Sequence, residues 1–200
     1  MIETMRNDTQ KFVSRTTARR QRSGLPALLI VALVLVGRVS LAGTDEANME
    51  YPVKAAMIVN FLQFVEWPPD ARPAEGAPIV VGVVGAGNPL GKALEQIVAN
   101  KTVAGHPVRV LYLNSGASAD GCHLLFVPRE QDNDFLRISQ RISAQPILTV
   151  GETDAFSRAG GIIRFYTEDN KVRFQINPDA AEKVNLKISS KLLKLAKIVR

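Results

Sequence analysis

The chain has 200 residues, of which 46% are hydrophobic and 22% are charged. This balance is typical of a globular protein and excludes a disordered or collagen-like chain. One cysteine and two histidines exclude an intramolecular disulfide framework and leave too few ligands for a thiolate or histidine metal centre. The formal charge of +6 at first suggests nucleic acid or an anionic membrane as a partner.

That charge is concentrated at the N-terminus, because seven of the 25 basic residues and only two of the 19 acidic ones lie in the first 42 positions. An uncharged apolar run follows over residues 25–36, and Ser40-Leu41-Ala42 offers small residues at signal-peptidase spacing. The pattern predicts a secretory signal peptide over residues 1–42, cleaved near Ala42, and an exported domain over residues 43–200. An uncleaved membrane anchor is the alternative, although Arg38 ends the apolar run short of a spanning helix. Removal of this segment leaves a nearly neutral chain, so we expect no nucleic-acid partner and no stable membrane insertion.

The predicted elements of the domain alternate between helices and strands. The first is a largely buried helix over residues 51–66, with Pro52 in its first turn and Trp67-Pro68 at its end. A proline-rich linker joins it to the rest. Strands are then predicted over residues 79–84, 108–113, 123–127 and 147–150, and helices over residues 89–98, 134–142 and 154–159.

The last part of the chain predicts a β-hairpin followed by helices. Residues 162–166 and 172–176 are its strands, and residues 167–171 are a five-residue connection. Asn177-Pro178 begins one helix, and Ser189 or Ser190 caps a final helix that runs to the C-terminus. The order of elements predicts a single compact α/β domain with a mostly parallel sheet, a C-terminal hairpin and flanking helices.

The turn between the first strand and its helix is a candidate anion-binding site. Gly85, Gly87 and Asn88 stand there, and backbone N–H groups at a helix N-terminus can hold a phosphate. The glycine spacing differs from the dinucleotide fingerprint, and no acidic residue ends the next strand to bind a ribose. A tight structural turn is therefore the alternative reading.

Cys122 is a lone thiol beside His123. The imidazole could activate a thiolate, but a cysteine at the start of an apolar strand is more often an inert, half-buried thiol. Neither His106 nor His123 has a neighbour at metal-ligand spacing, so both are expected to be structural. With no catalytic triad, paired carboxylates or metal set, the sequence predicts a protein without catalytic residues, metal or cofactor.

One face of the predicted hairpin is a candidate partner-binding surface. Alternation along the strands places Arg164, Tyr166, Arg173 and Gln175 on the side opposite the apolar residues. Arginine, tyrosine and amide side chains are common at protein interfaces. A solvated sheet face, or one covered by a helix, is the alternative. The lysines of the final segment likewise leave two readings open, a lipid or partner surface and a helix packed on its own core.

Five stretches that span nearly the whole exported domain are distinctive when taken together. They are Tyr51–Met57 with Asn60, Phe61 and Val65–Pro68; Cys122–Val127; Ile147–Gly151 with Phe156 and Gly160–Ile163; Lys171–Asn177 with Ala180 and Ala181; and Leu186–Ala196. In this order and spacing they resemble the YfiR-like family of exported bacterial proteins.

The resemblance implies a compact, often dimeric periplasmic domain. Its expected partner is the periplasmic domain of an inner-membrane diguanylate cyclase, which it represses, so that cyclic-di-GMP and biofilm formation fall. The alternative is a small-ligand sensor module acting with a sensor kinase. Redox-sensitive members rely on disulfides, and with Cys122 alone this chain has no intramolecular disulfide switch. The family carries no catalytic residues that would transfer to this sequence.

Overall fold

The computed structural model describes residues 44–200, and the predicted signal peptide over residues 1–42 lies outside this range. The helices are α2 (Thr44–Phe64), α3 (Pro89–Val98), α4 (Asp132–Arg141), α5 (Asp154–Arg158), α6 (Pro178–Lys183) and α7 (Ser190–Leu193), with 3-10 turns η2 (Pro69–Ala71) and η3 (Arg129–Gln131). The strands are β1 (Val65–Glu66), β2 (Ile79–Val84), β3 (Thr102–Val103), β4 (His106–Leu113), β5 (Leu124–Val127), β6 (Leu148–Gly151), β7 (Ile163–Glu168), β8 (Lys171–Ile176), β9 (Lys187–Ile188) and β10 (Lys197–Ile198).

An eight-stranded sheet organises the described part of the chain, in the order β10-β8-β7-β6-β5-β2-β4-β3. The five strands from β7 to β4 are parallel, β8 is antiparallel to β7, and β3 is antiparallel to β4. The predicted α/β fold class is confirmed, with the refinement that the sheet is mixed. A small second sheet pairs β1 with β9.

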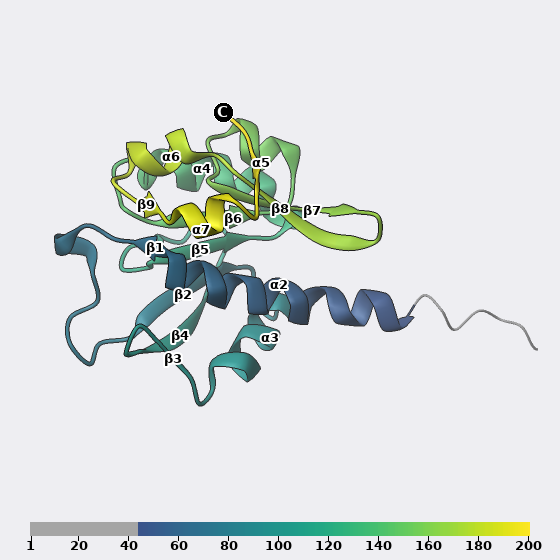
Figure 1. Ribbon diagram of the computed structural model, residues 1–200, viewed down its shortest axis with the longest axis horizontal. Helices are drawn as coiled ribbons and strands as arrows, with labels where there is room; N and C mark the ends of the chain where they lie inside the picture. The colour runs from purple at the N-terminus through teal and green to yellow at the C-terminus, as the bar shows by residue number, and fades with distance from the viewer. Residues whose placement is uncertain (1–43) are drawn as a thin grey trace, which may run out of the picture. The chain divides into compact units, whose positions relative to one another are not determined.

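Helices cover both faces of this sheet, with α2 and α3 on one side and α4 and α5 on the other (Figure 1). The alternation of side chains along β2 divides the core accordingly. Val81 and Val83 pack in the cluster that includes α2 and α3, whereas Val80 and Val84 pack with residues of α4. Strands buried on both faces explain the continuous apolar runs of β2 and β5.

Phe156 of α5 packs on two glycines, Gly151 at the end of β6 and Gly161 in the loop before β7. A Cβ atom added at Gly151 would lie 2.4 Å from the Phe156 ring, and one added at Gly161 would lie 2.1 Å from it. The ring also packs at 4.3 Å, centroid to centroid, on Phe135 of α4. The two glycines are therefore required for this close approach of a helix to the sheet.

Several predicted elements are confirmed, and a side chain caps the N-terminus of three of the helices. Strand β2 and helix α3 have the predicted bounds, and the Asn88 side chain accepts the Leu90 N–H at 2.9 Å. Thr153 caps α5 and Asn177 caps α6 in the same manner.

The predicted five-residue hairpin connection is wrong. Strands β7 and β8 extend to Glu168 and Lys171, which leaves a two-residue turn. Asp169 and Asn170 have φ values of 49° and 58°, as a type I′ turn requires. Both residue types tolerate the left-handed region, and this turn follows the natural twist of the two strands.

The predicted bounds of the first helix are also wrong. Helix α2 begins at Thr44, because the residues before Pro52 include the strong helix formers Glu, Ala and Met. Pro52 therefore lies inside the helix and not in its first turn. The helix ends at Phe64, because Val65 and Glu66 pair with β9, a partner more than 120 residues later in the chain.

The predicted C-terminal helix is wrong for a similar reason. Ser189 caps a single turn, α7, and the chain then extends as β10, which pairs with β8. The Val199 N–H donates to the Ile176 carbonyl at 2.9 Å. The terminal lysines therefore do not share one long helix face.

Candidate functional site

Helix α2 and the β7–β8 hairpin together extend past the carboxyl end of the parallel strands (Figure 1). Strand β7 pairs with β6 only at Ile163 and Arg164, and residues 165–168 continue beyond the end of β6. The N-terminal half of α2 reaches the same end, where Lys54 meets Glu152 just after β6. We call this pair of elements the arm.

Aromatic packing holds the arm together. The Phe61 ring of α2 lies 5.7 Å from the Phe165 ring and 5.0 Å from the Phe174 ring, measured between centroids. Phe165 and Phe174 are directly opposite each other on β7 and β8. One face of the hairpin is therefore a packing surface for α2.

A buried ion cluster fastens the arm to the sheet. Lys54 is only 5% exposed, and its Nζ forms ion pairs with the Glu152 carboxylate and, at 2.5 Å, with Glu50. Glu152 also accepts the Arg129 N–H at 3.0 Å, which connects the cluster to the end of β5. Two aromatic rings lie beside this cluster, since the Lys54 Nζ is 5.8 Å from the ring centroids of Tyr51 and Phe165.

The ion cluster changes the pKa values of Lys54 and of the neighbouring Tyr51. Burial acts to lower the pKa of Lys54, but the hydrogen bonds and charges of Glu152 and Glu50 outweigh it and raise that pKa above its usual value. Burial, followed by the charge of Glu152, raises the pKa of Tyr51. Lys54 is therefore held charged at neutral pH, in a structural role. The sequence analysis did not single out Lys54, although a lysine between two apolar stripes of a helix is a usable signal for a buried ion pair.

The outer face of α2 carries an exposed apolar strip, which consists of Met49, Pro52, Val53 and Ala56. Met49 is 62% exposed and Val53 is 37% exposed. The spacing of three or four residues places all four on one face of the helix. The first helix was predicted to be largely buried, but this face of it is exposed, because no element of the described chain covers this face of the arm. Exposed apolar surface of this kind is a candidate site for protein binding.

The four residues of the predicted partner-binding face share one side of the hairpin, where Arg164 is opposite Gln175 and Tyr166 is opposite Arg173. Half of that face is covered by α5. Gln175 is buried and donates to the Ser157 hydroxyl at 3.1 Å, and Arg164 pairs with Asp154 at 2.8 Å. Arg173 is exposed and Tyr166 is partly exposed. A binding role for this face stays a prediction, now confined to its outer half.

The predicted anion-binding turn lies at the carboxyl end of β2. This strand is the one at which the strand order reverses, a common ligand position in α/β sheets. Gly85 and Gly87 both have positive φ values, but two donors of the turn are already used. The Gly85 N–H donates to the Leu113 carbonyl, and the Leu90 N–H donates to Asn88. Anion binding here stays a prediction.

The lone thiol of Cys122 is buried, and burial raises its pKa, with the charge of Arg109 acting in the opposite direction. Burial is the larger effect, and a buried thiol with a raised pKa is typical of an inert cysteine rather than a nucleophile. Next to it, the His123 Nδ1 accepts the Val80 N–H at 3.0 Å, and burial, then the charge of His106, lowers the pKa of His123. The His123 carbonyl accepts the Trp67 indole N–H at 3.3 Å.

Two negative findings apply to residues 44–200. This range contains no group of three or more acidic, histidine or cysteine side chains close enough together to hold a metal ion. It also contains no helix with the length and hydropathy needed to cross a membrane.

Comparison with known proteins gives one family match. Residues 51–197 match the model of a family described as YfiR/HmsC-like. Among solved structures, the chain is similar to a conserved domain protein from Vibrio cholerae O1 biovar El Tor, with 12% identity and a TM-score of 0.48. That match covers 76% of this chain and 60% of the Vibrio chain. No curated protein matches the sequence.

Proposed function

The chain belongs to the YfiR/HmsC-like family, and from this we propose that it is a periplasmic regulatory protein that acts by binding rather than by catalysis. Its partner is the periplasmic domain of an inner-membrane diguanylate cyclase, which it represses. Repression lowers cyclic-di-GMP and, with it, biofilm formation. The main support for this proposal is the family match over residues 51–197.

The exposed apolar strip of α2 is the structural observation that supports a binding role most directly. Its four residues are uncharged and exposed to solvent. The opposite face of the same helix is packed on the core. Burying such a strip against a partner would contribute about 25 cal/mol for each Å² of apolar surface removed from water. A helix face of this kind fits a hydrophobic groove or a second helix on the partner.

Regulation by this surface requires a difference in affinity between two states of the partner. A protein that binds the inactive state of a cyclase more tightly shifts the population toward that state. A signal that weakens the complex then releases the enzyme. The ion cluster around Lys54 supports such a role for the arm, because it holds the helix in one position and lowers the entropic cost of binding.

The test measures cyclic-di-GMP in cells that carry the gene, lack it, or express a variant. Deletion should raise the nucleotide level, and the wild-type gene should restore it. Ala56→Glu places a charge in the strip at an exposed position, and it should leave the level as high as deletion does.

Gln63→Glu is the matched control, because residue 63 is exposed on the same face of α2, two turns from Ala56 and outside the strip. It should repress like the wild type. An unchanged cyclic-di-GMP level after deletion, in cells that contain a membrane diguanylate cyclase, would reject the regulatory function. Normal repression by Ala56→Glu protein of normal abundance would instead reject the strip as the binding surface.

A further inference from the structure

The end of the chain concentrates the positive charge of the exported domain. Residues 183–200 contain six basic and no acidic residues, whereas residues 43–182 contain 12 basic and 17 acidic ones. A nearly neutral domain therefore has a strongly basic last segment and a net negative charge over the rest. None of the six cations forms an ion pair with an acidic residue of the described chain, so their charge is available to a partner.

The packing of this last segment directs its cations to solvent. Leu192 is buried in the core cluster that includes α2, and Leu193 and Ala196 pack against the same cluster. One turn of helix and the pairing of β10 with β8 keep the segment compact, so the side chains that point away from the core lie close together. We call these exposed residues the terminal surface; they are Lys191, Lys194, Leu195, Lys197, Ile198 and Arg200.

Two aliphatic side chains stand among the cations of the terminal surface. Leu195 is 74% exposed and follows Lys194, and Ile198 is 45% exposed and follows Lys197. Exposed aliphatic residues next to cations are typical of segments that bind lipid surfaces. The aliphatic side chains enter the boundary between head groups and acyl chains, while the cations meet anionic head groups.

The kind of cation favours a lipid surface over a protein partner. Five of the six basic residues in residues 183–200 are lysines. Protein interfaces are enriched in arginine and depleted in lysine. A lysine can instead lay its aliphatic stem along an apolar surface while its ammonium group reaches the head groups.

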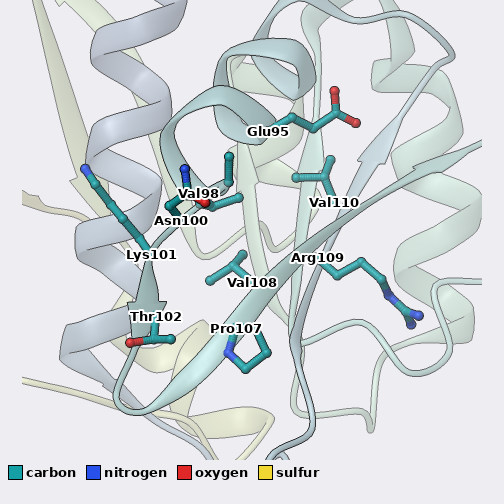
Figure 2. A pocket seen from close by; sticks show the side chains of 10 residues that line it. Glu95, Val98, Asn100, Lys101, Thr102, Pro107, Val108, Arg109 and Val110 are labelled. Atoms are coloured by element: carbon teal, nitrogen blue, oxygen red, sulfur yellow. The ribbon is translucent and has the colours of Figure 1, made fainter.

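The opposite edge of the sheet carries two exposed cations in a different setting. Lys101 precedes β3 and Arg109 lies on β4, whereas β10 is at the other end of the strand order. Both cations line a groove of about 440 Å³, where they point away from each other, and Glu95 lines the same groove (Figure 2). This edge therefore has mixed charge, and it provides a matched control for the terminal surface.

We propose that the terminal surface binds the anionic surface of a phospholipid bilayer, with its cations on the head groups and with Leu195 and Ile198 at the boundary with the acyl chains. Binding of this kind is peripheral and reversible, because two aliphatic side chains are too few to anchor a domain. The net negative charge of the rest of the domain opposes attachment through other faces, so the domain has a preferred orientation on the membrane. The proposal concerns where the protein acts and does not depend on the regulatory function.

The test is the partition of the exported domain between solution and phospholipid vesicles, measured by cosedimentation. Residues 43–200 include both core clusters, so this part of the chain folds as a unit. The wild type should bind vesicles of phosphatidylcholine with about one third phosphatidylglycerol, and should bind vesicles of phosphatidylcholine alone at least about tenfold more weakly. Salt raised to about 0.5 M should release it.

The variants separate local from net charge. Lys194→Gln/Lys197→Gln should weaken binding to anionic vesicles by about five- to thirtyfold, since each cation near such a surface contributes about fivefold. Lys101→Gln/Arg109→Gln removes the same charge at the opposite edge of the sheet and should change the partition less than about twofold. Leu195→Gln keeps every charge and should weaken binding by at least about threefold. All these positions are exposed, so the urea unfolding midpoints should stay close to that of the wild type.

Two results would overturn the proposal. The first is a wild-type protein that does not bind anionic vesicles at low salt, or that binds neutral vesicles equally well. In that case, loss of cyclic-di-GMP repression by Lys194→Gln/Lys197→Gln would assign the terminal surface to a protein partner. The second is an equal loss of binding in the two double variants, because net charge alone would then explain it. The vesicles contain no cyclase, so failure here and failure of the regulatory function are distinguishable.

Discussion

Gly82, in the middle of β2, shows how tightly one residue can be constrained by its neighbours. A Cβ atom there would lie 2.9 Å from the Cys122 Sγ, 3.1 Å from Leu113 Cδ1 and 3.2 Å from Leu125 Cδ1. Gly82→Ala should therefore lower the free energy of unfolding by about 1–3 kcal/mol, as overpacking of a core does. Urea denaturation measures the change.

The thiol of Cys122 provides the control for this prediction. Cys122→Ala removes the closest of the three contacts, so Gly82→Ala should cost less in the Cys122→Ala background than in the wild type. The double-mutant cycle then gives a non-zero coupling energy. Strict additivity of the two substitutions would show that the Gly82 penalty comes from elsewhere.

His123 makes stability depend on pH. Its pKa is lowered in the folded protein, so as pH falls through about 6.5 the unfolded chain takes up a proton that the folded chain does not. The stabilisation is therefore complete above the unfolded pKa and is lost progressively as pH falls toward the folded pKa. Unfolding free energies measured between neutral and mildly acidic pH should decline accordingly.

His123→Asn is the matching variant. The Asn amide oxygen occupies nearly the same position as imidazole Nδ1 and can accept the Val80 N–H, but it does not titrate in this range. The variant should lose most of the decline between neutral and mildly acidic pH. A slope as steep as that of the wild type would assign the effect to other groups.

At the scale of elements, the contact between α2 and the end of β6 depends on Lys54. Lys54→Met leaves the Glu152 carboxylate buried without its cation, and breaking such a pair costs about 3–5 kcal/mol. The double variant Lys54→Met/Glu152→Gln keeps an acceptor for the Arg129 N–H without a buried charge, and it should recover more than half of the loss. Thermal or urea unfolding of the wild type, the single variant and the double variant measures these changes. An unchanged unfolding midpoint for Lys54→Met would contradict the stabilising role assigned to the cluster.

Sequence patterns predicted the elements whose signals are local. The β2 run, the Asn88 cap of α3 and the Thr153 cap of α5 all depend on residues within a few positions of each other. Two of the mispredicted boundaries, the end of α2 and the end of the last helix, depend on distant partners. Helix α2 ends before Val65 because Val65 and Glu66 pair with β9. The last helix ends after one turn because the residues that follow it pair with β8 as β10. No local window contains that information.

At the scale of the whole molecule, the same distinction separates the predicted partner-binding face of the hairpin from the exposed strip of α2. Alternation placed Arg164 and Gln175 correctly on one face of the hairpin, but only the tertiary structure shows α5 lying over them. The exposed strip of α2 could not be predicted from the sequence, because an apolar residue such as Val53 can be either buried or exposed. Only the elements packed around the helix decide which it is. Which face of an apolar element stays uncovered is a property of the complete arrangement of layers.

The docking of Phe156 on Gly151 and Gly161 has a consequence for the divergence of this family. Because the ring occupies the space that either Cβ atom would need, the three positions cannot vary independently. A relative that carries alanine at a position equivalent to 151 or 161 should also carry a smaller side chain at the position equivalent to 156. These three positions are therefore expected to covary as one group, although they lie on strand β6, on helix α5 and in the loop before β7.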